Sequence, residues 1–268
     1  MNIDCRKQQV CLSIAGLDPS GGAGIIADVK AFRAFGCFSA AAVTSITFQN
    51  TQGVYGAIHQ SAETVRGQVQ PVIDDMTVAA VKTGMLPTRE VISETARSIA
   101  ANKLTNVIVD PVVRSTSGFD LIDEAALRSL IEELFPLADL VTPNVPEAER
   151  ITGIVIRTDA DVAAAAAAMR AMGARNVLIK GGHFGAERGV GRIARDFLFV
   201  GEELHCLDGE YFETTATHGT GCTLAAAITA NLAIGNGLID SVAIAKSFVA
   251  EAIRTAPHLG RGNSPINI

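Results

Sequence analysis

The sequence predicts an α/β fold in which helices pack on both faces of a parallel sheet. Short apolar runs alternate with stretches of helical period along the whole chain, which is typical of repeated strand–helix units. Hydrophobic residues make up 48% of the 268 residues, whereas aromatic residues make up only 5% and Trp is absent. Ala, Val, Ile and Leu must therefore fill the interior, as they do in buried parallel sheets.

The apolar runs predict strands at residues 10–15, 40–47, 79–82, 107–110, 140–142, 177–180, 196–200 and 203–207, the last two as a hairpin. The helices are expected at residues 22–35, 61–74, 88–102, 123–135, 160–172, 221–235 and 241–256. The alanine run at 163–168 belongs to a helix, because Ala is the best helix former and Thr158 or Asp159 can cap it. No linker divides the chain, so we expect residues 1–268 to form one domain.

Charge and cysteine usage exclude several classes of protein. The 22 Lys and Arg against 28 Asp and Glu give a net charge of −6, which disfavours a nucleic-acid partner. The five widely spaced cysteines form no CxxC pair, so they indicate neither a disulfide framework nor a zinc site. No apolar run is long enough for a signal or a membrane span. We expect a cytoplasmic protein with neither a nucleic-acid nor a membrane partner.

A glycine-rich loop, residues 16–24 (GLDPSGGAG), follows the first strand at the end where open α/β sheets bind ligands. Its four glycines allow the backbone to approach a ligand closely. The spacing matches neither a Walker A loop nor a dinucleotide fingerprint, so a tight structural turn is an equal alternative. Asp28 in the following helix is, taken alone, more typical of a solvated helix residue.

A second glycine-rich turn, residues 217–223 (THGTGCT), opens an Ala-rich helix. Free N–H groups and the helix dipole make such a turn an anion site, here for a transferring phosphoryl group. Cys222 lies in the first helical turn, where a thiol pKa tends to fall, and its thiolate could take a proton from a substrate hydroxyl. The alternative is a small buried cysteine. His218 and His183 are interpreted as structural.

Polar residues also follow three later strands. Asp110 together with Asn144 and Glu147 could hold Mg²⁺ through water. The alternative for Asn144 and Glu147 is a helix cap, and both interpretations can hold at once. Lys180 could meet nucleotide phosphates as a point charge; the alternative is an ordinary surface lysine.

In their order, these motifs resemble the hydroxymethylpyrimidine/phosphomethylpyrimidine kinase family of the ribokinase-like superfamily. The resemblance covers roughly residues 10–256. It is carried by residues 15–24 (AGLDPSGGAG), 27–30 (ADVK), 49–51 (QNT), 82–86 (KTGML), 110–112 (DPV), 142–144 (TPN) with Glu147, 180–183 (KGGH) and 217–223 (THGTGCT).

The resemblance implies a ribokinase-like three-layer αβα sandwich around a mainly parallel sheet. It implies an enzyme that uses ATP and Mg²⁺ to phosphorylate 4-amino-5-hydroxymethyl-2-methylpyrimidine and then its monophosphate, which gives the diphosphate used in thiamine biosynthesis. By the same analogy we expect a homodimer.

The resemblance also assigns roles to individual residues. It implies a pyrimidine pocket lined by Gly16, Asp28, Gln49 and Met85, a metal site at Asp110 and Glu147, and nucleotide contacts from Asn144, Lys180 and Thr217. It further implies an anion hole at Gly219, Thr220 and Gly221, with Cys222 as the base in place of the Asp that sugar kinases use. Gln49 suits an aminopyrimidine edge, because a side-chain amide both donates and accepts hydrogen bonds.

Two other functions stay open at this stage. A pyridoxal or pyridoxine kinase would use the same scaffold, and a non-catalytic pyrimidine-binding domain would not need the phosphoryl end. The chain departs from the family at Thr116, where a lysine is common, which leaves the role of residues 114–118 open. Residues 185–191 fit either a closing flap or a plain exposed loop, and residues 257–268 are expected to be irregular.

Overall fold

A computed structural model describes residues 8–113, 121–182 and 193–268 of the chain. Its sheet has nine strands in the order β3-β2-β1-β4-β5-β6-β7-β8-β9. From β2 to β7 all neighbouring strands are parallel, and β3 at one edge and the β8–β9 hairpin at the other are antiparallel. The strands are β1 (Val10–Leu17), β2 (Phe38–Asn50), β3 (Gly53–His59), β4 (Val78–Thr83), β5 (Val107–Val109), β6 (Leu140–Val141), β7 (Asn176–Ile179), β8 (Ile193–Val200) and β9 (Glu203–Glu210).

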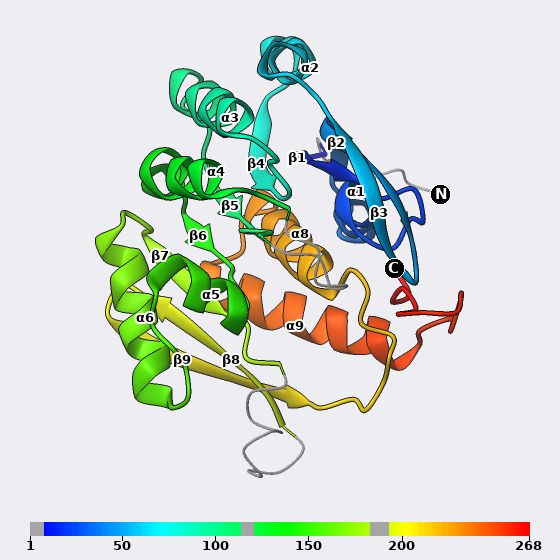
Figure 1. The fold of residues 1–268 in the computed structure, drawn as a ribbon, viewed down its shortest axis with the longest axis vertical. Coiled ribbons are helices and arrows are strands. Elements are labelled where there is room, and N and C mark those ends of the chain that lie inside the picture. The colour runs from blue at the N-terminus through cyan, green and yellow to red at the C-terminus, as the bar shows by residue number, and fades with distance from the viewer. Residues whose placement is uncertain (1–7, 114–120, 183–192) are drawn as a thin grey trace.

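Helices cover both faces of this sheet (Figure 1). They are α1 (Gly24–Ala34), α2 (Ala62–Asp75), α3 (Arg89–Ala101), α4 (Glu124–Ser129), α5 (Val145–Thr152), α6 (Asp159–Ala171), α8 (Thr220–Ala233) and α9 (Leu238–Arg254). The alternation within β5 illustrates the layering: Val107 and Val109 pack in the core with α2 to α6, whereas Ile108 packs on the opposite face with α8 and α9. The expected αβα sandwich with a mainly parallel sheet is confirmed.

Most of the expected strands and helices are found within a few residues of their predicted bounds, including the β8–β9 hairpin. The alanine-rich helix α6 is capped by the Thr158 side chain, which accepts a hydrogen bond from the Asp161 backbone. The helix expected at 123–135 is wrong in its second half. After α4 the chain forms a π turn at Leu130–Leu134 and a 3-10 turn at Phe135–Leu137, where Pro136 has no N–H to continue an α-helix.

Two elements were not predicted. Strand β3 contains Gly53 and Gly56, which interrupt its apolar alternation. Helix α5 is only eight residues long, and its start shows in the sequence only as the Asn144–Glu147 cap. In the part of the chain that the structure describes, no helix is both long and apolar enough to cross a bilayer.

Residues 257–268 are irregular, as expected, but they are packed against the body of the protein. The backbone N–H of Asn263 donates to the carbonyl oxygen of Thr51 at 2.8 Å, in the turn between β2 and β3. The N–H of His218 donates to the carbonyl oxygen of Ser264 at 3.2 Å, and the Ser264 side chain is buried. The tail therefore contacts the turn that follows Gln49 and the glycine-rich turn at 217–223.

Candidate active site

The polar residues that follow β5, β6 and β7 meet at one end of the sheet. The Lys180 ammonium lies 2.9 Å from Asp110 Oδ1 and 4.0 Å from Glu147 Oε2. The Thr142 hydroxyl donates to the same Asp110 oxygen at 3.1 Å. Burial opposes the negative charge of Asp110, but the charges of Lys180 and Lys82 outweigh it, so the pKa of Asp110 lies below its usual value. Lys180 is thus no ordinary surface lysine, and a charged cluster forms where the fold predicts a ligand.

Asn144 and Glu147 form a capping box at the start of α5. The Glu147 backbone N–H donates to Asn144 Oδ1 and the Asn144 backbone N–H donates to Glu147 Oε2, each at 2.8 Å. The capping alternative is therefore correct, and it holds both side chains beside Lys180. Burial raises the pKa of Glu147 to about 7; Lys180 opposes this rise and Asp110 adds to it. The cap uses Oε2 of Glu147, and the metal role of this residue stays a prediction.

The turn at 217–222 packs tightly on the first glycine-rich loop. Gly219 has a φ of +85°, and a Cβ built there would lie 1.8 Å from the carbonyl oxygen of Gly22. Only glycine fits this approach. A Cβ on Gly221 would lie 3.2 Å from the Lys180 ammonium, so that cation lies beside the first turn of α8. The N–H groups of a helix start and a lysine therefore converge, which is a favourable arrangement for an anion. Thr217 stands just before them, and its carbonyl accepts the Thr220 N–H at 3.3 Å.

The expectation that the Cys222 pKa falls is wrong. Burial raises the pKa of Cys222 to about 11. The charge of Lys82 opposes this rise, whereas the carboxylates of Asp110 and Asp28 add to it. The helix N-terminus favours a thiolate, but here desolvation and two nearby negative charges outweigh it. In the ligand-free protein Cys222 is a neutral thiol near pH 7.

Asp28 is fully buried, so the solvated alternative is wrong. Its Oδ2 accepts hydrogen bonds from the Ser13 hydroxyl at 2.6 Å and the Lys82 ammonium at 3.0 Å. Within the described residues, Asp28 Oδ1 is buried and has no hydrogen-bond partner. Burial raises the pKa of Asp28, and the charge of Lys82 only partly offsets this rise. For Lys82 the balance is reversed: burial lowers its pKa, but the charge of Asp28 opposes burial and the pKa is raised. An unsatisfied buried oxygen of this kind fits a ligand that donates a hydrogen bond.

Lys82 was not among the predicted site residues. Its side chain is fully buried, and its charge acts on Asp28, Asp110 and Cys222. A Cβ on Gly84 would lie 2.9 Å from its ammonium, so the absence of a side chain at Gly84 leaves room for it. The sequence could have pointed to this residue, because a lysine ends the apolar run at 79–82. A buried strand position takes a charge only when the charge is paired.

The remaining residues predicted for the pyrimidine pocket lie around the ends of β1, β2 and β4. Gly16 faces Met85, whose sulfur would lie 3.2 Å from a Cβ at Gly16. The Thr44 hydroxyl donates to the Met85 carbonyl at 2.6 Å. Gln49 lies at a register shift between β2 and β3, and its amide nitrogen is 3.5 Å from His218 Nε2.

Asp18 and His218 connect the two glycine-rich loops. His218 Nε2 lies 2.7 Å from Asp18 Oδ2. Asp18 also accepts the backbone N–H groups of Ser20 at 2.8 Å and Ala23 at 2.9 Å. Burial opposes its charge, but the hydrogen bonds from His218 and Ser20 outweigh this, so the pKa of Asp18 is lowered. The structural interpretation of His218 holds, and the residue also contacts Gln49.

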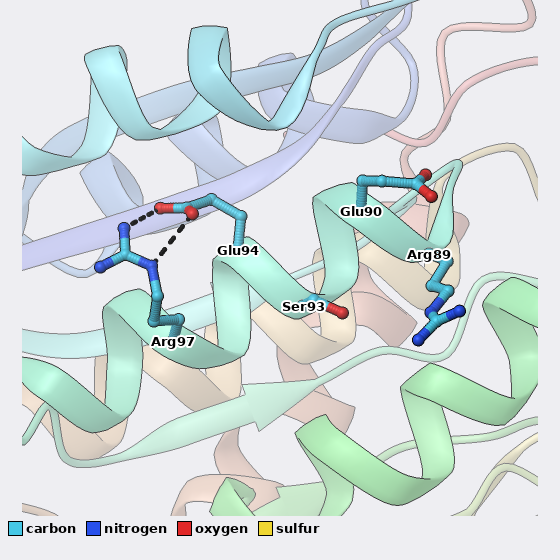
Figure 2. Close-up of a pocket in the computed structure, with 5 residues that line it drawn as sticks. All are labelled: Arg89, Glu90, Ser93, Glu94 and Arg97. Carbon is cyan, nitrogen blue, oxygen red and sulfur yellow. Dashed lines mark hydrogen bonds and ion pairs between the residues drawn. The ribbon is translucent and has the colours of Figure 1, made fainter.

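Two surface depressions are lined by other residues. One of about 400 Å³ on α3 is lined by Arg89, Glu90, Ser93, Glu94 and Arg97. Figure 2 shows Glu94 paired with Arg97 and Arg89 pointing away from them. The other, of about 600 Å³, lies between β9 and α9. None of the predicted site residues lines either depression.

Some predictions fall outside the described residues: the loop at 114–118, the flap at 185–191 and His183. Among the residues that the structure does describe, no three His, Cys, Asp or Glu side chains cluster as metal ligands. Asp110 and Glu147 form a pair of carboxylates instead. Such a donor set fits Mg²⁺, which keeps several waters and is commonly held by one or two carboxylates together with substrate phosphates.

Lys180 lies beside the first turn of α8, paired with Asp110 at the end of β5 and close to Glu147 at the start of α5. Such a group of charges suits phosphoryl transfer, in which charge on phosphate oxygens must be neutralised and positioned. The family model for phosphomethylpyrimidine kinase matches residues 18–267, and the chain belongs to that family of kinases.

Individual relatives agree with this assignment. The chain is 39% identical over 262 residues to the hydroxymethylpyrimidine/phosphomethylpyrimidine kinase of Staphylococcus aureus strain MSSA476, covering 97% of this chain and 94% of that protein. Among solved structures, pyridoxal kinase from Bacillus subtilis in complex with ADP matches with a TM-score of 0.87 and 35% identity over 97% of both chains. Phosphomethylpyrimidine kinase from Clostridium difficile 630 matches with a TM-score of 0.80 and 37% identity, covering 92% of this chain and 100% of that one.

Proposed function

We propose that this kinase transfers phosphate from ATP to 4-amino-5-hydroxymethyl-2-methylpyrimidine and then to the resulting monophosphate, as a step of thiamine biosynthesis. One observation carries the proposal: two charged pairs, Lys82 with Asp28 at 3.0 Å and Lys180 with Asp110 at 2.9 Å, both lie within electrostatic range of Cys222. The proposed ring-recognition and phosphate-binding regions would therefore adjoin. The family membership and the named relatives support the substrate.

Lys180 and the turn at 219–221 would bind the transferring phosphoryl group. The ammonium and the helix N–H groups would neutralise its oxygens, which is the main contribution a protein makes to this reaction. Asn144 and Thr217 would contact the nucleotide from either side. Asp110 and Glu147 would hold Mg²⁺, which would supply positive charge to neutralise the phosphates.

Asp28, Gln49, Met85 and Gly16 would bind the pyrimidine ring. The free oxygen of Asp28 can accept a hydrogen bond from the ring substituents. Met85 would offer its flexible apolar side chain, with Gly16 leaving space beside it.

The two phosphorylation reactions need different help from the protein. The first nucleophile is a neutral hydroxyl that benefits from a base, for which Cys222 is the candidate, whereas the second is a phosphate oxygen that is already ionised.

The depression between β9 and α9 would receive the nucleoside. Asp196 connects it to the phosphate-binding region, since its Oδ1 accepts the Gly181 N–H at 2.9 Å and its Oδ2 pairs with Lys246 on α9. Lys246, Ala243 and Ser247 line the depression. We expect Ser247→Trp to raise the KM for ATP at least tenfold without changing pyrimidine binding. An unchanged KM for ATP would show that the nucleoside binds elsewhere.

A homodimer is part of this proposal. On the outer face of the β2–β3 ribbon, Ile46 lies opposite Ile58, and Phe48 lies opposite Gly56. Ile46, Phe48 and Ile58 are 41–56% exposed. Three neighbouring exposed apolar side chains on a sheet face are typical of an interface, and a second copy would cover them with the same surface by two-fold symmetry. The opposite side of this ribbon carries the buried Thr47 and the half-buried Gln49.

Pyridoxal is the second candidate substrate, because pyridoxal kinases are among the close structural matches. A non-catalytic role gains no support, since the phosphate-binding groups are assembled. A cytoplasmic location is consistent with Cys11, Cys37, Cys206 and Cys222 all being free thiols. Mass spectrometry of the products tests the proposal: a monophosphate should appear first and a diphosphate later, and a reaction that ends at the monophosphate would contradict it.

A further inference from the structure

The C-terminal tail, residues 257–268, wraps around Thr51 in the turn between β2 and β3. The Thr51 hydroxyl oxygen accepts the backbone N–H groups of Arg261 at 3.3 Å and Gly262 at 3.4 Å. The Thr51 carbonyl oxygen accepts the N–H of Asn263 at 2.8 Å. A Cβ on Gly262 would lie 2.1 Å from that carbonyl oxygen, so the contact leaves no room for a side chain at this position.

The same tail also holds the backbone of the glycine-rich turn at 217–223. The N–H of His218 donates to the carbonyl oxygen of Ser264 at 3.2 Å, and His218 pairs with Pro265 in a short parallel bridge. The two preceding N–H groups, by contrast, donate to oxygens of their own segment. The tail therefore supplies the backbone partner of the turn immediately before Gly219.

The tail is itself held in place on both sides of this contact. Ser264 is buried, and its hydroxyl oxygen accepts the N–H of Leu259 at 2.9 Å, which closes this part of the tail into a loop around Thr51. Further along, the N–H of Asn267 donates to the carbonyl oxygen of Ala252 in α9 at 3.0 Å. An anchored segment of this kind can fix the glycine-rich turn relative to Thr51.

The proposed anion hole depends on the exact placement of this turn. A Cβ on Gly219 would lie 1.8 Å from the carbonyl oxygen of Gly22, so the turn already packs against the first glycine-rich loop. Pro265 of the tail packs against the same glycine, because a Cβ on Gly22 would lie 3.0 Å from the proline Cβ. Hydrogen-bond donors stabilise a transferring group well only when they are held in position beforehand, and a displacement of about 1 Å can cost about 10²-fold in rate.

We infer that the tail is a positioning element for phosphoryl transfer: by binding both Thr51 and the backbone of His218, it holds the N–H groups of residues 219–221 where they meet the transferring group. This inference rests on the proposed function, which places the anion hole at that turn. Thr51 and Ser264 are positioning residues that act through the turn. The hole serves both phosphorylation steps, so loosening the tail should slow both steps alike, unlike the loss of Cys222.

The main test is Gly262→Ala. Gly262 has no positive φ, so the added methyl group acts through its contact with Thr51 and not through backbone strain. We expect kcat to fall at least tenfold for both pyrimidine substrates, with the KM values for ATP and the pyrimidines within about threefold. The inhibition constant of aluminium fluoride with ADP, a mimic of the transferring phosphoryl group, should rise by the factor by which kcat falls. The matched control is Gly67→Ala in α2, where a Cβ would meet nothing within 4 Å and activity should stay at the wild-type level.

Thr51→Val and Thr51→Ser repeat the test with a smaller change, in case Gly262→Ala fails to fold. Only Thr51→Val loses the hydroxyl oxygen that accepts two tail N–H groups, so only this variant should lower kcat, by about threefold or more. Hydrogen exchange of the wild type needs no variant. Coupling between two sites is reciprocal, so ADP with aluminium fluoride should slow the exchange of the N–H groups of residues 261–263.

Three results would overturn the inference while the proposed function stands. They are an unchanged kcat in a folded Gly262→Ala or Thr51→Val, a rise in the pyrimidine KM at constant kcat, and tail hydrogen exchange that does not respond to ADP with aluminium fluoride. A wild-type protein that phosphorylates neither pyrimidine would overturn the proposed function instead, and the exchange measurement would still decide the role of the tail.

Discussion

Removing the Cys222 thiol should slow the first phosphorylation step far more than the second. The hydroxyl of the first substrate has to lose a proton, whereas the phosphate oxygen of the second does not. General-base help is typically worth about 10²- to 10⁴-fold. We therefore expect Cys222→Ala to lower kcat/KM for the first step by about 10²-fold or more, and for the second step by less than about threefold.

The raised pKa of Cys222 adds a pH dependence. With a pKa of about 11, about one thiol in three thousand is ionised at pH 7.5. A base must be deprotonated to act, so kcat/KM of the wild type for the first step should rise about tenfold per pH unit from pH 7 to 10. The second step should not follow this slope, and neither should the first step in the variant.

The assay couples ADP release to NADH oxidation, with each substrate supplied separately between pH 7 and 10. Cys222→Ser serves as the matched control, because a hydroxyl at the same helix start ionises far less readily and should behave like Ala. Equal losses on both substrates, or a flat pH profile in the wild type, would show that Cys222 contributes packing and not proton transfer.

Three further changes test other parts of the structure. Lys82→Met should lower the free energy of unfolding in urea by about 3–5 kcal/mol, because it leaves the buried Asp28 carboxylate without its cation. The double variant Lys82→Met with Asp28→Asn should recover much of this loss. A single variant as stable as the wild type would contradict the buried ion pair. Gly219→Ala should abolish phosphoryl transfer, because the added methyl group would clash with the backbone of Gly22. Gly235 also has a positive φ but faces open space, so Gly235→Ala should keep activity. Similar activity in both variants would refute the close approach. Phe48→Glu should convert a dimer to a monomer in sedimentation equilibrium, and an unchanged dimer would place the interface elsewhere.

Much of the candidate site could be predicted because the parallel strands of an open α/β sheet bind ligands beyond one common end. Asp110 follows β5, Asn144 and Glu147 follow β6, and Lys180 follows β7, so the order of the elements is enough to bring them together. The glycine turns also follow from local rules, since Gly219 and Gly221 open a helix. Residue type and position carry this information without any knowledge of side-chain contacts.

What could not be predicted depends on packing between distant segments. The sequence does not reveal that Lys82 pairs with Asp28, 54 positions earlier, or that Asp18 bonds His218, 200 positions later. The Cys222 pKa was predicted in the wrong direction for the same reason. The helix start is visible in the sequence, but the burial and the nearby carboxylates that outweigh it are not.

The most direct test of the proposed activity is an ADP-release assay with Mg²⁺ and ATP, in which the hydroxymethyl pyrimidine, its monophosphate and pyridoxal are compared at equal concentrations. Turnover of both pyrimidines with pyridoxal slow is the predicted result. If pyridoxal were the fastest substrate, the phosphate-binding groups would keep their proposed roles, but the proposed pyrimidine pocket around Gln49 would be contradicted.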